Sequence, residues 1–452
     1  MSDGPLFRSL CALLLTLLIS ACGSSTGLDP WERDASSVPD ARLGDDAGRA
    51  DVFLRPDARP DVSPPECGGS GTIGQIRAQV SDIDSRVAVG RDGMLFTARQ
   101  EGAAWFALGL DPCLEERWIQ PLRGDGRPAE VDVSVSDSGD VWWAADSVRG
   151  EWHFSHDGEP LQGLPPMDQR RGTFVGLADG TGPIFSASFA SDDWWLVRNV
   201  GGRREELSLP SSPFVWKDEC VILGQGIACY QIAIDESPLS IRWEQTTSPR
   251  IVDGTLRHIV PPATDGRRLW TIEWGIFTYD LVGVDLETGE RVIRVPFLRT
   301  SNQNDLLLGP PVITERGDII VYRRASIVPG ALVSYTPEGV VRWEVPFMPS
   351  SDERPGRPVS TNVATHLVGA GGIVYLAMGS AVVALDEEDG GELWRLDGLG
   401  NVNQGALNLS PNGDLYVRNA GGTLYAITTG SAGLASTPWP IPGGNARLSR
   451  AR

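Results

Sequence analysis

Short apolar segments alternate with polar, glycine-containing turns along most of this chain. Between Val87 and Val417, a pair of apolar segments joined by such a turn recurs eight times, most clearly at Val87–Phe96 and Leu407–Tyr416. The turn glycines stand 40 to 55 residues apart and are Gly93, Gly139, Gly182, Gly226, Gly266, Gly317, Gly372 and Gly413. A β-hairpin that returns about every 45 residues is typical of a β-propeller, in which each repeat is a four-stranded blade. The pattern therefore predicts an all-β chain folded as an eight-bladed β-propeller with four-stranded antiparallel blades.

A second pattern follows the hairpins and predicts the outer part of each blade. Its best copies are Val383–Trp394 and Val282–Ile293, and more divergent copies cover residues 110–118, 234–243 and 333–343. In this pattern an apolar strand enters a turn in which Asp accepts hydrogen bonds from backbone N–H groups and Gly tolerates a positive φ. The chain then returns as an outer strand, and we expect its tryptophan to pack between neighbouring blades.

These residues resemble the repeat of the quinoprotein-type (PQQ-like) β-propellers, whose consensus is roughly Ala-Leu-Asp-x-x-Thr-Gly-x-x-x-Trp. The match is close in the two best copies, partial in the divergent copies and poor in the second and third blades. The resemblance implies a ring that is closed by strands from both ends of the chain. We therefore expect Gly71–Val80 to supply the strand that completes the last blade and removes its open edge.

The N-terminal residues are typical of an export signal. An apolar run over residues 10–19 is too short to span a bilayer, and it ends in Ile-Ser-Ala-Cys at 19–22. This ending resembles a bacterial lipobox, which predicts a signal peptide at 1–21 and lipid acylation of Cys22. An ordinary secretory signal cleaved near Ala21 is the alternative, and both readings predict export. Because neither of the two residues after Cys22 is aspartate, the sorting rule of model Gram-negative bacteria favours the outer membrane.

The segment after the signal differs from the rest of the chain in composition. Residues 22–66 are rich in Asp, Ala, Pro, Gly and Ser and show no apolar periodicity. They carry too little apolar surface to offset the entropy lost on ordering. We therefore predict a lipid-anchored, disordered tether at 22–66, followed by the propeller at 67–452.

The formal net charge of −20 narrows the range of partners. Nucleic-acid binding depends on clustered cations that neutralise phosphates, and contact with anionic lipid depends on polybasic segments. An acidic chain suits neither. We expect the acidic residues mainly to form a solvated surface that keeps an exported protein soluble.

Four cysteines remain once the signal is removed and Cys22 is acylated: Cys67, Cys113, Cys220 and Cys229. Four cysteines allow three sets of pairs. We favour Cys220–Cys229 across one hairpin, and Cys67–Cys113 between the end of the tether and the first blade. The spacing of these cysteines fits neither a zinc site nor covalent haem, so we predict no metal ligands.

The family that the repeats resemble contains two functional classes. Its dehydrogenases hold pyrroloquinoline quinone and Ca²⁺ in the central funnel, whereas its non-catalytic members, among them outer-membrane assembly lipoproteins, are interaction platforms. This chain has no adjacent cysteine pair, a single lysine (Lys217) and only four histidines. His153 and His156 are three positions apart and would face opposite sides of a strand, which disfavours a shared metal. We therefore predict no enzymatic activity and no cofactor.

Two tryptophan pairs are the candidate binding residues: Trp142–Trp143 and Trp194–Trp195. Neighbours on a strand face opposite sides, so one member of each pair should pack between blades. The other member either covers a blade edge or lies at a rim, where exposed aromatic residues bind partners. The sequence thus predicts a monomeric, membrane-anchored propeller that binds an unidentified envelope protein. A quinoprotein dehydrogenase and a carbohydrate-binding or adhesin propeller are the alternatives.

Overall fold

The computed structural model describes the greater part of the predicted propeller. The described residues are 71–122, 131–135, 139–145, 151–161, 171–175, 184–188, 194–200, 203–209, 221–223, 228–233, 240–246, 263–274, 278–299, 307–325, 328–347, 366–402, 407–437 and 440–441, with only the backbone between 171 and 246. All of them belong to the second of two compact units, Val62–Arg452. They form strands and turns, and no helix among them is long and apolar enough to cross a membrane.

Within each sheet, the paired strands are antiparallel. The first fifteen are β1 (Ile76–Val80), β2 (Ala88–Val89), β3 (Leu95–Glu101), β4 (Ala104–Leu110), β5 (Glu116–Leu122), β6 (Val131–Val135), β7 (Val141–Ala145), β8 (Glu151–Phe154), β9 (Arg171–Val175), β10 (Ile184–Ser188), β11 (Trp194–Val200), β12 (Arg203–Leu209), β13 (Val221–Leu223), β14 (Ala228–Ala233) and β15 (Ser240–Thr246). The others are β16 (Ala263–Thr264), β17 (Arg268–Trp274), β18 (Thr278–Asp285), β19 (Arg291–Arg299), β20 (Leu307–Leu308), β21 (Val312–Ile313), β22 (Ile319–Ala325), β23 (Val328–Tyr335), β24 (Val341–Phe347), β25 (His366–Gly369), β26 (Ile373–Met378), β27 (Ala381–Asp386), β28 (Glu392–Leu396), β29 (Leu407–Leu409), β30 (Asp414–Arg418) and β31 (Leu424–Thr428).

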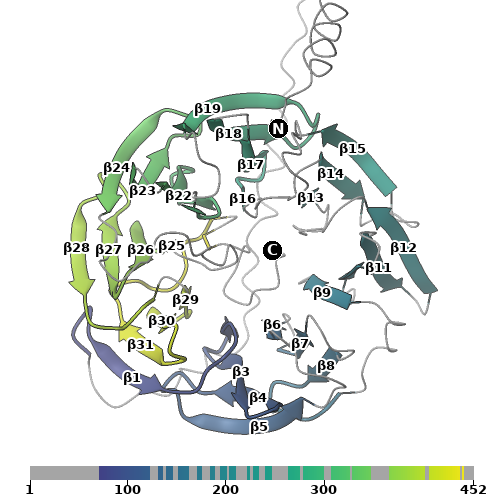
Figure 1. The fold of residues 1–452 in the computed structure, drawn as a ribbon, viewed down its shortest axis with the longest axis vertical. Helices are drawn as coiled ribbons and strands as arrows, with labels where there is room; N and C mark the ends of the chain where they lie inside the picture. Colours follow the sequence, from purple (N-terminus) through teal and green to yellow (C-terminus); the bar gives the residue numbers. More distant parts are fainter. Residues whose placement is uncertain are drawn as a thin grey trace, which may run out of the picture. The chain divides into compact units, whose positions relative to one another are not determined.

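These strands form eight antiparallel sheets around a centre (Figure 1). Sheets such as β2–β5 and β25–β28 have four strands in simple sequential order. The innermost strands of successive sheets contact one another, as at β2 with β6, β21 with β25, and β25 with β29. The predicted all-β propeller with four-stranded antiparallel blades is therefore confirmed. The predicted count of eight blades for the whole chain stays a prediction.

The ring is closed by strands from the two ends of the described chain. β1 pairs antiparallel with β31 and so becomes the outer strand of the sheet β1–β31–β30–β29, as the resemblance implied. On the other side of this sheet, β29 contacts β2 of the first blade. The buried Asn408 amide donates a hydrogen bond to the Val87 carbonyl at 2.8 Å across this boundary. Residues far apart in sequence therefore hold the ring together.

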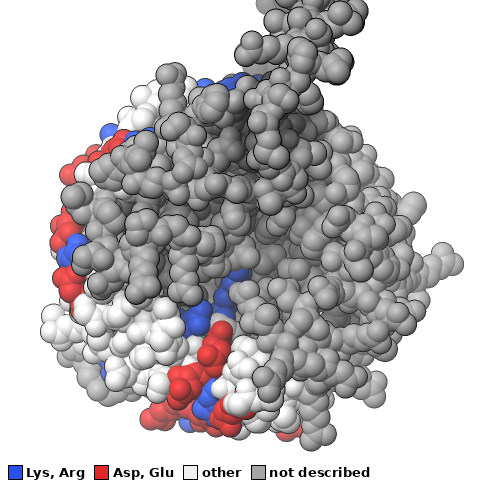
Figure 2. Space-filling view, viewed as in Figure 1, with Lys and Arg blue, Asp and Glu red and all other residues white. Residues whose placement is uncertain are grey.

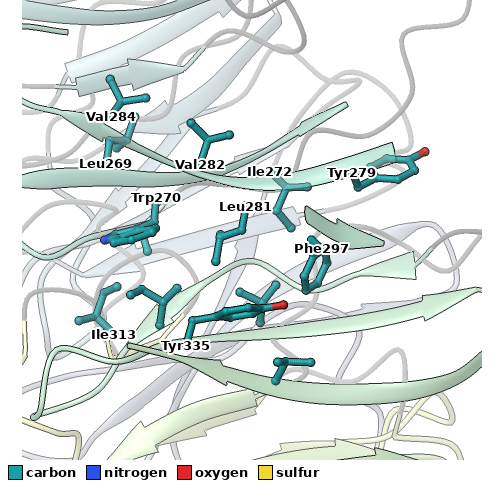
Figure 3. Packing of buried hydrophobic residues seen from close by; sticks show 14 of the residues in the cluster. Leu269, Trp270, Ile272, Tyr279, Leu281, Val282, Val284, Phe297, Ile313 and Tyr335 are labelled. Atoms are coloured by element: carbon teal, nitrogen blue, oxygen red, sulfur yellow. The ribbon is translucent and has the colours of Figure 1, made fainter. Parts of the chain in front are cut away.

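Both faces of β18 are buried, although it lies next to the outer strand of its sheet. In β18, the consecutive residues Leu281 and Val282 point to opposite faces, and both are fully buried. Figure 3 shows Trp270 of β17 and Tyr335 of β23 in one apolar cluster with Leu281. Transfer of this apolar surface out of water is the main term that favours the ring.

Outer-strand tryptophans interlock each blade with the next one. The indole N–H of Trp118 in β5 donates to the His156 carbonyl at 2.9 Å, in the turn after β8. The indole N–H of Trp343 in β24 donates to the Glu387 carbonyl at 2.8 Å, in the turn after β27. In that turn Gly390 has a φ of 73°, and a Cβ there would lie 3.0 Å from the Trp343 ring. The sequence expectation that these tryptophans pack between blades is confirmed at both boundaries.

Candidate binding surface

β7 carries the first predicted tryptophan pair, and its two members have different environments. Trp143 is fully buried. Its ring is edge-on to Trp118 at 5.9 Å and to Phe154 at 5.4 Å between ring centroids. Its indole N–H donates to the Thr97 carbonyl at 3.3 Å. Trp143 is therefore part of the apolar contact between the first two sheets and is not available to a partner.

Trp142 lies on the opposite face of the same sheet and is half-buried. Its ring stacks on the imidazole of His153 in β8, with centroids 4.4 Å apart and planes 9° from parallel. His153 Nε2 lies 3.9 Å from an Asp140 carboxylate oxygen. Trp142 is thus the member of the pair whose position remains compatible with the predicted role in binding.

The second pair, Trp194 and Trp195, begins β11. Their backbones pair with Ser188 and Ala187 of β10 on one side. On the other side they pair with β12. Side-chain orientation at these positions lies outside the described part of the structure, so the role of this pair stays a prediction.

The histidines that stand three positions apart in the sequence do not share a site. His153 stacks on Trp142, whereas His156 Nε2 lies 2.7 Å from the Asp92 carboxylate in the preceding blade. The hydrogen bond to Asp92 outweighs desolvation and, with the Asp92 charge, raises the pKa of His156 to about 9. The imidazole is therefore charged at neutral pH and forms an ion pair between two blades. Among the described side chains, no group of three His, Cys, Asp or Glu residues is arranged to hold a metal ion.

Buried ionisable groups also serve the contacts between strands. Asp414 is nearly buried, and burial raises its pKa although Arg77 lies 2.7 Å away and acts in the opposite direction. Arg77 also donates to the Pro112 carbonyl in the first blade, so it bridges the ring closure. His366 in β25 is fully buried, which lowers its pKa to about 4 and keeps it neutral. Arg77 and Asp414 thus serve contacts between strands, and His366 is part of the buried interior.

The predicted cysteine sites are only partly within the described structure. Cys113 follows β4 and is disulfide-bonded, with a partner outside the described side chains. The backbone of Cys229 in β14 is paired with Leu223 of β13. Cys22, Cys67 and Cys220 lie outside the described residues. Acylation of Cys22 and both predicted disulfide pairings therefore stay predictions.

The structure is similar to solved β-propellers, although no protein-family model and no curated protein matches the sequence. BamB from Moraxella catarrhalis is 12% identical at a TM-score of 0.53, over 79% of this chain and all of that one. The Dos1 propeller is 9% identical at a TM-score of 0.57, over 78% of this chain and 95% of that one. Sqt1 from Saccharomyces cerevisiae is 9% identical at 0.54, over 79% and 100%.

These likenesses show the fold. This chain is a β-propeller. The likeness to BamB also agrees with the resemblance of the repeats to the PQQ-like class. At identities of 9 to 12%, the three structures carry no information about ligands or partners.

The sequence missed one contact between turns of neighbouring blades. His156 and Asp92 stand 64 positions apart in the chain, in turns of two different blades. Each residue alone has the pattern of an ordinary polar turn. The only signal in the sequence was indirect: both turns belong to the periodic repeat. The two residues meet only because one blade packs against the next.

Proposed function

We propose that this chain is an exported lipoprotein whose propeller is a non-catalytic protein-binding scaffold at the cell envelope. The observation that carries the proposal is the ring itself. In its described part, buried charged groups and outer-strand indoles have partners across strand and blade boundaries. Arg77 with Asp414 and Trp343 with the Glu387 carbonyl are examples. A rigid ring of this kind presents its rims and outer strands as the main surfaces for contact.

The envelope location rests on the sequence. The lipobox-like residues 19–22 and the acidic, proline-containing segment at 22–66 suit a lipid anchor at Cys22 and a tether that holds the propeller away from the bilayer. A myristoyl-sized chain alone gives only marginal membrane binding, so acylation with more than one chain is required for a stable anchor. We propose the outer membrane as the location.

Two alternatives each have an observation in their favour. The PQQ-like repeats are shared with dehydrogenases, so a quinoprotein would show quinone absorbance and Ca²⁺-dependent dye reduction. The half-buried Trp142, flat against His153, resembles an aromatic platform for a sugar. A glycan-binding propeller would lose retention on a glycan column when Trp142 is replaced by alanine, with the buried Trp143 left intact.

The scaffold proposal is tested on the full-length protein in its own membrane. Cells are treated with a reversible crosslinker, the protein is extracted in detergent and purified, and its mass is measured before and after reversal. We expect a defined complex with one or a few envelope proteins that is lost when Cys22→Ala prevents anchoring. Recovery of the uncomplexed protein at every crosslinker concentration would refute the scaffold role.

A further inference from the structure

The large apolar side chains that the described structure leaves exposed lie at the outer strands of four sheets. All six lie in, or up to three residues before, the outer strands β1, β19, β24 and β28, and they are Ile73, Ile76, Val292, Val340, Val341 and Leu393. Their exposed fractions range from 42% for Ile76 to 62% for Val340. The four sheets are consecutive in the ring, because β16 contacts β21, β21 contacts β25, and β25 contacts β29. We call these six residues the apolar row.

The apolar row follows one rim of the ring. Each member lies within three positions of a turn glycine with positive φ, at the point where the chain enters an outer strand; these glycines are Gly74, Gly289, Gly339 and Gly390. The corresponding positions of the first blade, at the start of β5, hold the exposed charged residues Glu115, Glu116 and Arg117. The propeller fold therefore does not require apolar residues at the start of an outer strand.

Outer strands are normally protected against association with other chains. β1, β19, β24 and β28 each form the end of their sheet, so one side of each backbone has no strand partner in the described sheets. Edge strands with exposed apolar residues are sites of β-pairing, and charged residues usually prevent it. Apolar residues at the start of four neighbouring edges thus favour a contact that covers them.

The charge next to the row indicates which kind of partner fits. Exposed carboxylates accompany it on the turns and outer strands: Glu287, Glu290, Glu338, Glu388, Asp389 and Glu392. Nearby arginines already have carboxylate partners: Arg291 pairs with Glu273 at 2.5 Å and Arg342 with Asp318 at 2.6 Å. Arg316 lies 3.7 Å from Glu388 and neutralises part of the charge of that turn. Figure 2 shows acidic side chains, with some basic ones among them, along the outer edge over β24 and β28. The surface is therefore both apolar and negative.

We propose that the apolar row docks a segment of a partner protein that carries apolar and basic side chains. The apolar side chains would cover the row, and Lys or Arg would pair with the flanking carboxylates. A second copy of this chain fits less well, because two acidic surfaces of the same kind would repel each other. The inference rests on the proposed scaffold role and specifies the surface and the partner chemistry for it.

The test measures fluorescence anisotropy of a labelled peptide with alternating Leu and Lys, titrated with the full chain. A Leu–Glu peptide of equal length is the charge control. The apolar variant combines Val292→Ser, Val341→Ser and Leu393→Ser. The charge variant combines Glu290→Gln, Glu338→Gln and Glu392→Gln. The matched control combines Glu115→Gln, Glu116→Gln and Glu159→Gln, which removes three exposed carboxylates from the first two blades.

We expect the Leu–Lys peptide to bind the wild-type chain and the Leu–Glu peptide to bind at least tenfold more weakly. Loss of three exposed ion pairs, each modest, is expected to reduce affinity about tenfold in the charge variant. The apolar variant should show a loss of similar size, and the matched control less than about twofold. Because all substituted residues are exposed, thermal unfolding should remain as in the wild type.

With the purified chain, three results would overturn the docking proposal. They are absence of Leu–Lys binding to the wild type, an equal loss in the matched control, and self-association of the wild type that the apolar variant abolishes. Failure of the scaffold role is a separate result, since the native protein would then be recovered without a crosslinked partner. If the native complex persists in the apolar and charge variants, the docking role of the apolar row is refuted and the proposed scaffold function is retained.

Discussion

The interlock between neighbouring blades can be tested at Gly390. With a φ of 73°, alanine at this position costs about 1–2 kcal/mol from backbone conformation alone. A Cβ would also lie 2.8 Å from Val345 Cγ2 and 3.0 Å from the Trp343 ring, and such overpacking costs about 1–3 kcal/mol. We therefore expect Gly390→Ala to reduce the free energy of unfolding by about 2–5 kcal/mol.

Gly371 provides a matched control in the same blade. Its φ is 83°, but a Cβ there would meet no atom within 4 Å. Gly371→Ala should therefore cost only the conformational part, about 1–2 kcal/mol. Urea unfolding followed by tryptophan fluorescence and circular dichroism measures both variants. In a Trp343→Ala background, Gly390→Ala should lose the part of its additional cost that the ring causes, whereas the contact with Val345 remains. Equal losses for the two glycines, or strict additivity with Trp343→Ala, would refute the interlock.

Three further outcomes follow from the described side chains. Trp343→Phe removes the hydrogen bond to Glu387 and should cost about 1 kcal/mol in urea unfolding, with the native fold retained. Burial lowers the pKa of His366 to about 4, so as the pH falls the unfolded chain is protonated at this residue before the folded chain is. The free energy of unfolding should therefore fall by about 2 kcal/mol from pH 7 to pH 5. His366→Gln should remove this dependence. Because Asp92 raises the pKa of His156 to about 9, the ion pair stabilises the fold fully below about pH 6.5, and this stabilisation is lost as the pH rises through 9. Between about pH 7 and 10, the melting temperature of the wild type should therefore fall more steeply than that of His156→Gln.

Much of the fold follows from local periodicity. Each hairpin has its own apolar alternation and turn glycine, so repeats such as Leu407–Tyr416 are visible without any tertiary information. The outer-strand tryptophans were predictable for the same reason, because Trp343 stands at a fixed distance from Gly339 in its turn. Ring closure by β1 was expected from the resemblance to the PQQ-like propellers, which implies that strands from both chain ends join.

The surface properties depend on tertiary placement and were less accessible. Alternation required Trp142 and Trp143 to face opposite sides, but only the packing of the first two blades shows that Trp143 is the buried one. The pair of His156 and Asp92 depends on the alignment of two separate turns. Exposure of Val341 and Leu393 in the apolar row is likewise a property of the outer edge, because the same apolar residues in an inner strand would be core.

The scaffold and dehydrogenase proposals differ most directly in how they expect the protein to respond to the cofactor. The measurement is thermal melting and dye-linked turnover of the purified full chain after incubation with pyrroloquinoline quinone and Ca²⁺. The scaffold account predicts an unchanged melting temperature and no turnover with alcohols or sugars. A Ca²⁺-dependent stabilisation of the size expected for a ligand at 100 times its Kd, about 2.7 kcal/mol, together with turnover, would contradict it.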